Sequence, residues 1–198
     1  MTRVKLCGLR SEADVRAVLE LCPDYAGFIL SEGFRRSITR GNFEKLSGML
    51  SGSGIQRVGV FVNEPLDSLV CFVSALDLIQ LHGTEDDDYI SLLRRFTDKP
   101  IIKAFTVKTE ADIEAARVSS ADYVLLDSGT GTGTAFDHSL IKDIGRPFFL
   151  AGGLTSENVG GAIDRFEPFA VDASSSLETN GVKDKTKMSA FVITVRGN

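Results

Sequence analysis

The sequence has no long hydrophobic run, only three cysteines and only two histidines. No apolar stretch reaches the length of a membrane span, and the N-terminus lacks the apolar core of a signal peptide. Cys7, Cys22 and Cys71 are widely spaced and form no CxxC or Cys/His pattern. We therefore expect reduced thiols, no metal site and no membrane partner, in a cytoplasmic protein.

An excess of positive charge is also absent. The 198 residues include 22 lysines and arginines against 27 aspartates and glutamates, which gives a net charge of -5. Such a balance disfavours binding to nucleic acid or to a membrane surface. It still permits a small anionic substrate, because a local arginine or a cluster of backbone N–H groups overrides a weak overall field.

Linkers and low-complexity tracts are missing as well, so residues 1–198 are predicted to form a single domain. That length suffices for a sizeable core.

Short apolar runs recur along the chain. Most are continuous rather than alternating, which is typical of parallel strands that are covered on both faces. The runs that we predict to be strands are Val4–Cys7, Ala26–Leu30, Val58–Val62, Leu78–Leu81, Ile101–Phe105, Tyr123–Asp127, Phe148–Ala151 and Ala170–Ala173.

Amphipathic stretches separate these runs and carry signals of helix starts. Ser11 and Thr109 each precede acidic residues, as helix N-caps commonly do. Thr155 or Ser156 is the predicted cap of the helix after the seventh strand, and Asp184–Val195 is the predicted closing helix.

Eight strand–helix units in one domain predict an α/β fold of the closed (β/α)8 type, a TIM barrel. The alternative is a doubly wound open sheet, which normally has its phosphate-binding glycines after the first strand. Here Gly8 stands alone at that place, and the paired glycines come late in the chain.

In a barrel of this kind, side chains at the carboxyl ends of the strands point into the active site. Cys7, Asp127 and Asp172 each lie at or next to the end of a predicted strand. A carboxylate at such a place is costly to desolvate unless it is paired or functional. The alternatives are structural: a small buried residue for Cys7, and a helix cap or a salt-bridge partner for the two aspartates.

Loop residues supply further candidates. Arg35 and Arg36 follow the second strand, and a guanidinium group suits a substrate carboxylate. His82 follows the fourth strand and is a candidate substrate-binding residue, with a hydrogen-bonded structural role as the alternative. His138 is predicted to begin a helix at the surface.

Glycine- and serine-rich turns follow the last two strands. Gly152 with Gly153, and Ser174 with Ser175, stand where these barrels bind phosphate through backbone N–H groups. A third glycine-rich segment, within residues 129–137, lacks the GK[ST] ending of a nucleotide-binding loop. We predict it to be a mobile lid over the phosphate.

Several of these segments together resemble a known family. Single pieces are weak evidence, whereas the ordered set, which runs along nearly the whole chain, resembles phosphoribosylanthranilate isomerase. The segments are Lys5–Leu9, Val58–Asn63, Ile79–Gly83, Leu125–Asp127, Phe136–Asp137, Ala151–Val159 and Val171–Ser175, followed by Glu178, Gly181, Lys183 and Asp184.

The resemblance implies a (β/α)8 isomerase of tryptophan biosynthesis that needs no cofactor and no metal. N-(5-phosphoribosyl)anthranilate, a small phosphorylated substrate, would undergo an Amadori rearrangement to 1-(2-carboxyphenylamino)-1-deoxyribulose 5-phosphate. By matching position, Cys7 is the general base and Asp127 the general acid. Arg36 matches the arginine that holds the anthranilate carboxylate, and Asp172 matches a carboxylate that contacts the sugar. The late turns match the phosphate site, and we expect a monomer or a homodimer.

The chemistry makes opposite demands on the acid and the base. Asp127 must hold a proton that it donates to the ribose ring oxygen, so that the ring opens to a Schiff base. Cys7 must take the proton from C2 of the sugar as a thiolate, which a locally positive field favours. Lys5 is close enough in the sequence to contribute to that field.

The sequence departs from the family pattern at two places that affect binding. Ser176 stands where the family has a glycine, and the arginine loop leaves open whether Arg35 or Arg36 meets the carboxylate. Two other functions stay possible. One is a different phosphosugar enzyme, against which the thiol of Cys7 argues, because the related histidine-pathway isomerases have a carboxylate there. The other is a barrel that binds a phosphorylated ligand without turnover, for which Ser176 is the only support.

Overall fold

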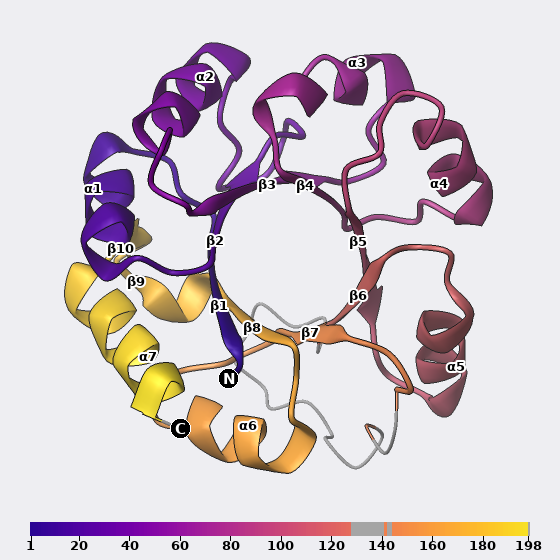
Figure 1. Ribbon diagram of the computed structural model, residues 1–198. Helices are drawn as coiled ribbons and strands as arrows, with labels where there is room; N and C mark the ends of the chain where they lie inside the picture. Colours follow the sequence, from indigo (N-terminus) through magenta and orange to yellow (C-terminus); the bar gives the residue numbers. More distant parts are fainter. Residues whose placement is uncertain (128–140, 142–143, 198) are drawn as a thin grey trace.

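Eight parallel strands close into a barrel in the computed structural model, which describes residues 1–127, 141 and 144–197. Each strand pairs with the next one along the chain, and the eighth pairs with the first (Figure 1). The predicted barrel is therefore confirmed, and the open sheet is wrong. The strands are β1 Arg3–Cys7, β2 Tyr25–Ile29, β3 Gln56–Phe61, β4 Leu78–Leu81, β5 Ile101–Thr106, β6 Tyr123–Asp127, β7 Phe148–Leu150 and β8 Ala170–Ala173.

Helices surround the barrel as an outer ring (Figure 1). A short hairpin of β9 Glu178–Thr179 and β10 Val182–Lys183 follows β8, after a 3-10 turn at Ser175–Leu177. The described helices are α1 Glu12–Leu21, α2 Arg40–Met49, α3 Leu66–Val70, α4 Asp87–Leu93, α5 Glu110–Val118, α6 Val159–Phe166 and α7 Lys185–Gly197. None of these helices is long and apolar enough to cross a membrane.

The helix starts follow the sequence signals in two cases and depart from them in one. Ser11 caps α1 by accepting a hydrogen bond from the Asp14 N–H (3.2 Å), and Thr109 caps α5 in a similar capping box. The cap predicted at Thr155 or Ser156 is wrong, because α6 begins only after Asn158. The Asn158 side chain accepts the Thr155 N–H (2.8 Å) and so holds the preceding residues in a turn.

Strand alternation decides which side chains lie inside the barrel. The side chains of successive residues in a strand point to opposite faces of the sheet. A residue that directly precedes or follows an outward-pointing apolar residue therefore points into the barrel. On β1, β4, β6 and β8 the outward residues belong to the core between strands and helices: Val4, Leu6, Ile79, Leu81, Val124, Leu126, Val171 and Ala173. The alternating inward positions at the carboxyl ends of these strands are therefore Cys7, Gln80, Asp127 and Asp172.

The lower part of the barrel interior is apolar. A separate cluster of buried side chains fills it, and among them Tyr25 and Phe149 pack with ring centroids 5.4 Å apart. The cluster consists of Tyr25, Val58, Leu78, Ile102, Ala104, Leu125, Phe149, Ala151 and Ala170. The inward side chains of Cys7, Gln80, Asp127 and Asp172 lie beyond this cluster, at the end where the strands terminate, as the barrel rule predicts.

Candidate active site

A cavity of about 200 Å³ opens at the carboxyl ends of the strands. Its walls come from both the strand ends and the loops that follow them. The site residues predicted from the sequence that line it are Cys7, Arg36, His82, Asp127, Gly152, Gly153, Asp172, Ser174 and Ser175. Residues that the prediction missed also line it: Ile29, Val60, Gln80, Ala151, Leu154, Ala173 and Ser176. Arg35 does not line it, and its side chain is 54% exposed.

The Cys7 thiol lies at the end of β1 and is buried. Gly27 on the neighbouring strand leaves the space for it, because a Cβ there would lie only 2.7 Å from the Cys7 sulfur. Burial raises the pKa of the Cys7 thiol, and the nearby Lys5 ammonium only partly opposes this. This environment therefore favours the neutral thiol.

Lys5 and Asp172 form a buried ion pair beside this thiol. The Lys5 Nζ lies 2.9 Å from Asp172 Oδ2, and the lysine side chain is completely buried. Burial alone would lower the pKa of Lys5, but Asp172 and Cys7 outweigh it and raise the pKa. Burial also raises the pKa of Asp172, against the opposing effect of Lys5. The other oxygen of Asp172, Oδ1, is buried without a hydrogen-bond partner among the described residues, on a side chain that lines the cavity.

A second polar group joins β4 to β6 across the cavity. The His82 Nε2 lies 3.4 Å from Asp127 Oδ2, and the Gln80 amide lies 3.0 Å from His82 Nδ1. Gln80 is almost fully buried, so its amide fixes the orientation of the imidazole ring. The prediction missed Gln80, although its polar side chain in the apolar strand β4, two residues before His82, was a usable signal.

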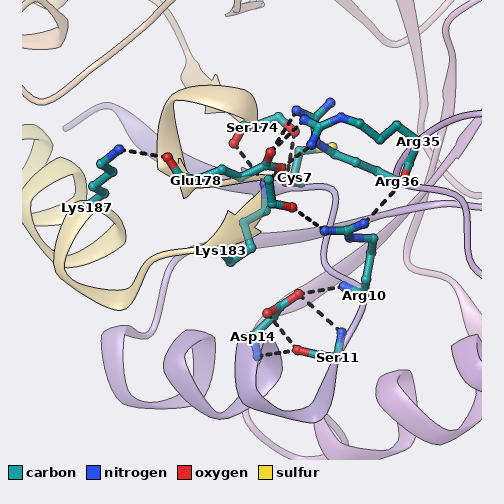
Figure 2. A network of polar contacts seen from close by, with 11 residues as sticks. Cys7, Arg10, Ser11, Asp14, Arg35, Arg36, Ser174, Glu178, Lys183 and Lys187 are labelled. Carbon is teal, nitrogen blue, oxygen red and sulfur yellow. Dashed lines mark hydrogen bonds and ion pairs between the residues drawn. The ribbon is translucent and has the colours of Figure 1, made fainter.

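The third group is a set of cations around one carboxylate, and Figure 2 shows their side chains converging on Glu178. Arg36 Nε donates to Glu178 Oε1 (2.5 Å) and Arg36 Nη2 to Oε2 (3.1 Å). Arg35 Nη2 donates to Oε2 (2.6 Å), and Lys183 Nζ to Oε1 (3.1 Å). Burial alone would raise the pKa of Glu178, but the hydrogen bonds from Arg36 and Arg35 lower it to about 2. The carboxylate is therefore ionised throughout the neutral range.

The two turns predicted to bind phosphate have different backbones. Gly152 and Gly153 have φ of +90° and +65°, values that favour glycine. Ser174 donates from its hydroxyl to the Cys7 carbonyl (3.1 Å) and so ties its turn to β1. Ser176 lies in the 3-10 turn and is not among the described non-glycine residues with positive φ, so a serine in place of the glycine that the resemblance implies causes no left-handed strain.

The segment 129–137, expected to be a lid, and His138 lie outside the described residues. Among the described residues, no group of three or more histidine, cysteine or acidic side chains is placed to hold a metal ion.

The comparisons with known proteins agree on one family. A family model described as N-(5'-phosphoribosyl)anthranilate (PRA) isomerase matches residues 4–194. N-(5'-phosphoribosyl)anthranilate isomerase of Endomicrobium trichonymphae is 42% identical over 195 residues, which cover 95% of each chain.

Solved structures extend the likeness to the whole fold. Phosphoribosyl anthranilate isomerase from Thermotoga maritima is 36% identical, with a TM-score of 0.91 and full coverage of both chains. A phosphoribosyl anthranilate isomerase in complex with reduced 1-(o-carboxyphenylamino)-1-deoxyribulose 5-phosphate is 35% identical, with a TM-score of 0.89 and the same coverage.

Proposed function

Because the chain belongs to the phosphoribosylanthranilate isomerase family, an enzyme family of tryptophan biosynthesis, we propose that it rearranges N-(5-phosphoribosyl)anthranilate with Asp127 as general acid and Cys7 as general base. One observation supports this assignment above all. A thiol and a carboxyl group from two non-neighbouring strands, β1 and β6, line the same cavity with an arginine and two phosphate-sized turns. The whole chain, residues 1–198, would act as one domain.

The first step needs a proton on the ribose ring oxygen. Asp127 donates it, the C1–O bond to the ring breaks, and the substrate nitrogen supplies the electrons that form the cationic Schiff base. His82 then faces the carboxylate that remains, since its Nε2 lies 3.4 Å from Asp127 Oδ2. In this position the imidazole stabilises the ionised form of the acid after its proton has left.

The second step removes the proton from C2 of the sugar. Burial raises the pKa of Cys7, so the thiol needs positive charge nearby in order to ionise. Lys5 supplies part of that charge, and the Schiff base cation adds more when it forms. The thiolate takes the C2 proton, and the resulting enolamine then tautomerises to the ketone.

The remaining cavity residues would hold the two anionic ends of the substrate and the sugar between them. Arg36 would bind the anthranilate carboxylate; it lines the cavity, whereas Arg35 does not. Asp172 and His82 would contact the sugar hydroxyls. The backbone N–H groups of the late turns would bind the phosphate, at the positions Gly152, Gly153, Ser174 and Ser175.

The test is a fluorescence assay that follows consumption of N-(5-phosphoribosyl)anthranilate by the purified protein. Cys7→Ala and Asp127→Asn are each expected to lower kcat by about 10²–10⁴-fold, the usual contribution of a general acid or base. Cys71→Ala removes an exposed thiol and serves as the matched control. Near-normal kcat in both active-site variants would refute the assignment.

The same assay examines the non-catalytic alternative. A wild-type protein that binds the substrate and never converts it would favour that alternative. Its only support in the sequence was Ser176, and this residue has an ordinary backbone conformation in the 3-10 turn.

A further inference from the structure

Glu178 is a buried ionised group to which the proposed mechanism gives no task. Its side chain is only 4% exposed, and it accepts hydrogen bonds from Arg35, Arg36 and Lys183. It is not among the residues that line the cavity, so it would not itself touch the substrate. Glu178 instead holds the guanidinium group of Arg36, a residue that does line the cavity.

Glu178 engages one particular edge of the Arg36 guanidinium group. Both oxygens of the carboxylate pair with the side-on edge, formed by Nε and Nη2, at 2.5 and 3.1 Å. The end-on edge, formed by Nη1 and Nη2, remains for a second carboxylate, because no hydrogen bond among the described residues engages Nη1. Arginine binds carboxylates in two parallel hydrogen bonds through either edge.

The aliphatic stem of the Arg36 side chain is held in place, as is the edge of its guanidinium group. The stem packs against the backbone of Gly8, because a Cβ added at Gly8 would lie only 2.6 Å from Arg36 Cδ. Gly8 directly follows Cys7, so the arginine is held beside the thiol. With both stem and edge fixed, the guanidinium group loses little freedom when a substrate binds, and this favours affinity.

The charges around Glu178 leave the cluster positive. Three cations, Arg35, Arg36 and Lys183, share a single carboxylate. A second anion can therefore join Arg36 without displacing Glu178. Lys183 also donates to the Ser174 carbonyl (2.8 Å), which connects the arginine to the turn expected to bind phosphate. One network thus reaches from the arginine expected to bind the carboxylate to the turn expected to bind the phosphate.

We propose that Glu178 is a positioning residue, which presents the end-on edge of Arg36 to the carboxylate of the aromatic amine and so selects substrates that carry this carboxylate. The inference rests on the proposed function of the cavity. It assigns the selectivity to a residue outside the cavity, acting through the arginine within it.

The experiment compares two substrates, N-(5-phosphoribosyl)anthranilate and N-(5-phosphoribosyl)aniline, which lacks the carboxylate. In Glu178→Gln we expect kcat/KM for the anthranilate substrate to fall by about tenfold or more, mainly through KM, because a charge-assisted pair that orients Arg36 is lost. For the aniline substrate we expect a change of less than about threefold, because uniform binding to the sugar and phosphate is retained. Glu32→Gln, at an exposed position in the same loop as Arg36, should leave both substrates unchanged.

Glu178→Asp keeps the buried charge but withdraws it from Arg36 by one methylene group, so it should show the same selective loss even if the glutamine variant fails to fold. An equal loss on both substrates would mark Glu178 as a purely structural residue and overturn the proposal. If the ratio of kcat/KM for the two substrates in Glu178→Asp equals that of the wild type, the proposal is overturned as well. A wild-type enzyme that converts neither substrate would instead refute the proposed function, and the inference with it.

Discussion

Replacing Glu178 with glutamine should make the stability of the barrel less dependent on pH. The folded protein lowers the pKa of this carboxyl from 4.5 to about 2, through Arg36, Arg35 and Lys183. A group whose pKa falls on folding stabilises the fold when it is ionised. That stabilisation is complete above its pKa in the unfolded chain and is lost as the pH falls through its pKa in the folded protein.

The size of the effect follows from the two pKa values. The difference between 4.5 and about 2 corresponds to about 3 kcal/mol of stability at neutral pH. About 2 kcal/mol of this is lost by pH 3. The side chain is 4% exposed, so screening by solvent reduces the figure little.

Urea unfolding of the wild type and of Glu178→Gln, at pH 7 and at pH 3, measures this contribution. All other titrating groups are common to both proteins, so the difference between their free energies of unfolding isolates Glu178. We expect the advantage of the wild type to shrink by about 2 kcal/mol between the two pH values. Glu32→Gln, at an exposed position, is the control, and its free energy of unfolding should stay within about 0.5 kcal/mol of the wild-type value at both pH values. A difference for Glu178→Gln that stays constant from pH 7 to pH 3 would show that the cations do not hold this carboxylate ionised in the fold.

Two substitutions next to Cys7 give further predictions. Gly27→Ala places a Cβ 2.7 Å from the Cys7 sulfur, so it should destabilise the fold by about 1–3 kcal/mol in urea unfolding and lower kcat. The control is Gly41→Ala, whose Cβ meets nothing within 4 Å and which should change neither quantity. Equal effects of the two substitutions would contradict the crowding argument. Lys5→Met removes the partner of buried Asp172 and the main opposition to the raised pKa of Cys7. Alkylation of the Cys7 peptide by iodoacetamide at pH 8, followed by mass spectrometry, should then be slower than in the wild type, and an unchanged rate would show that Lys5 does not favour the thiolate.

The sequence predicted the barrel because its strands are continuous apolar runs, which a sheet covered on both faces requires. The same pattern put Cys7 and Asp127 at strand ends, where side chains of such a barrel are expected to point into the active site. Strand ends differ from the predicted ones by no more than two residues. The start of α6 was missed because the side chain of Asn158 competes for the backbone of Thr155, which the apolar pattern does not reveal.

The partners of the site residues were harder to predict than the residues themselves. Glu178 lies 142 residues after Arg36, and it meets the arginine only because β8 closes the barrel against β1. No local pattern predicts such a pair. Gln80 and Lys5 were easier to identify from the sequence, because each is a polar residue at an inward position of an apolar strand. The catalytic and binding roles of the cavity residues remain predictions.

The most direct test of the proposed mechanism is a crystal structure of this protein with reduced 1-(2-carboxyphenylamino)-1-deoxyribulose 5-phosphate. We predict that the Cys7 sulfur and an Asp127 oxygen both lie about 3–4 Å from the sugar, on different sides of it, as reacting groups do. The phosphate should accept hydrogen bonds from the turns that contain Gly153 and Ser175. A ligand that contacts only one of the two groups, or that lies with its sugar outside this cavity, would contradict the proposed acid–base pair.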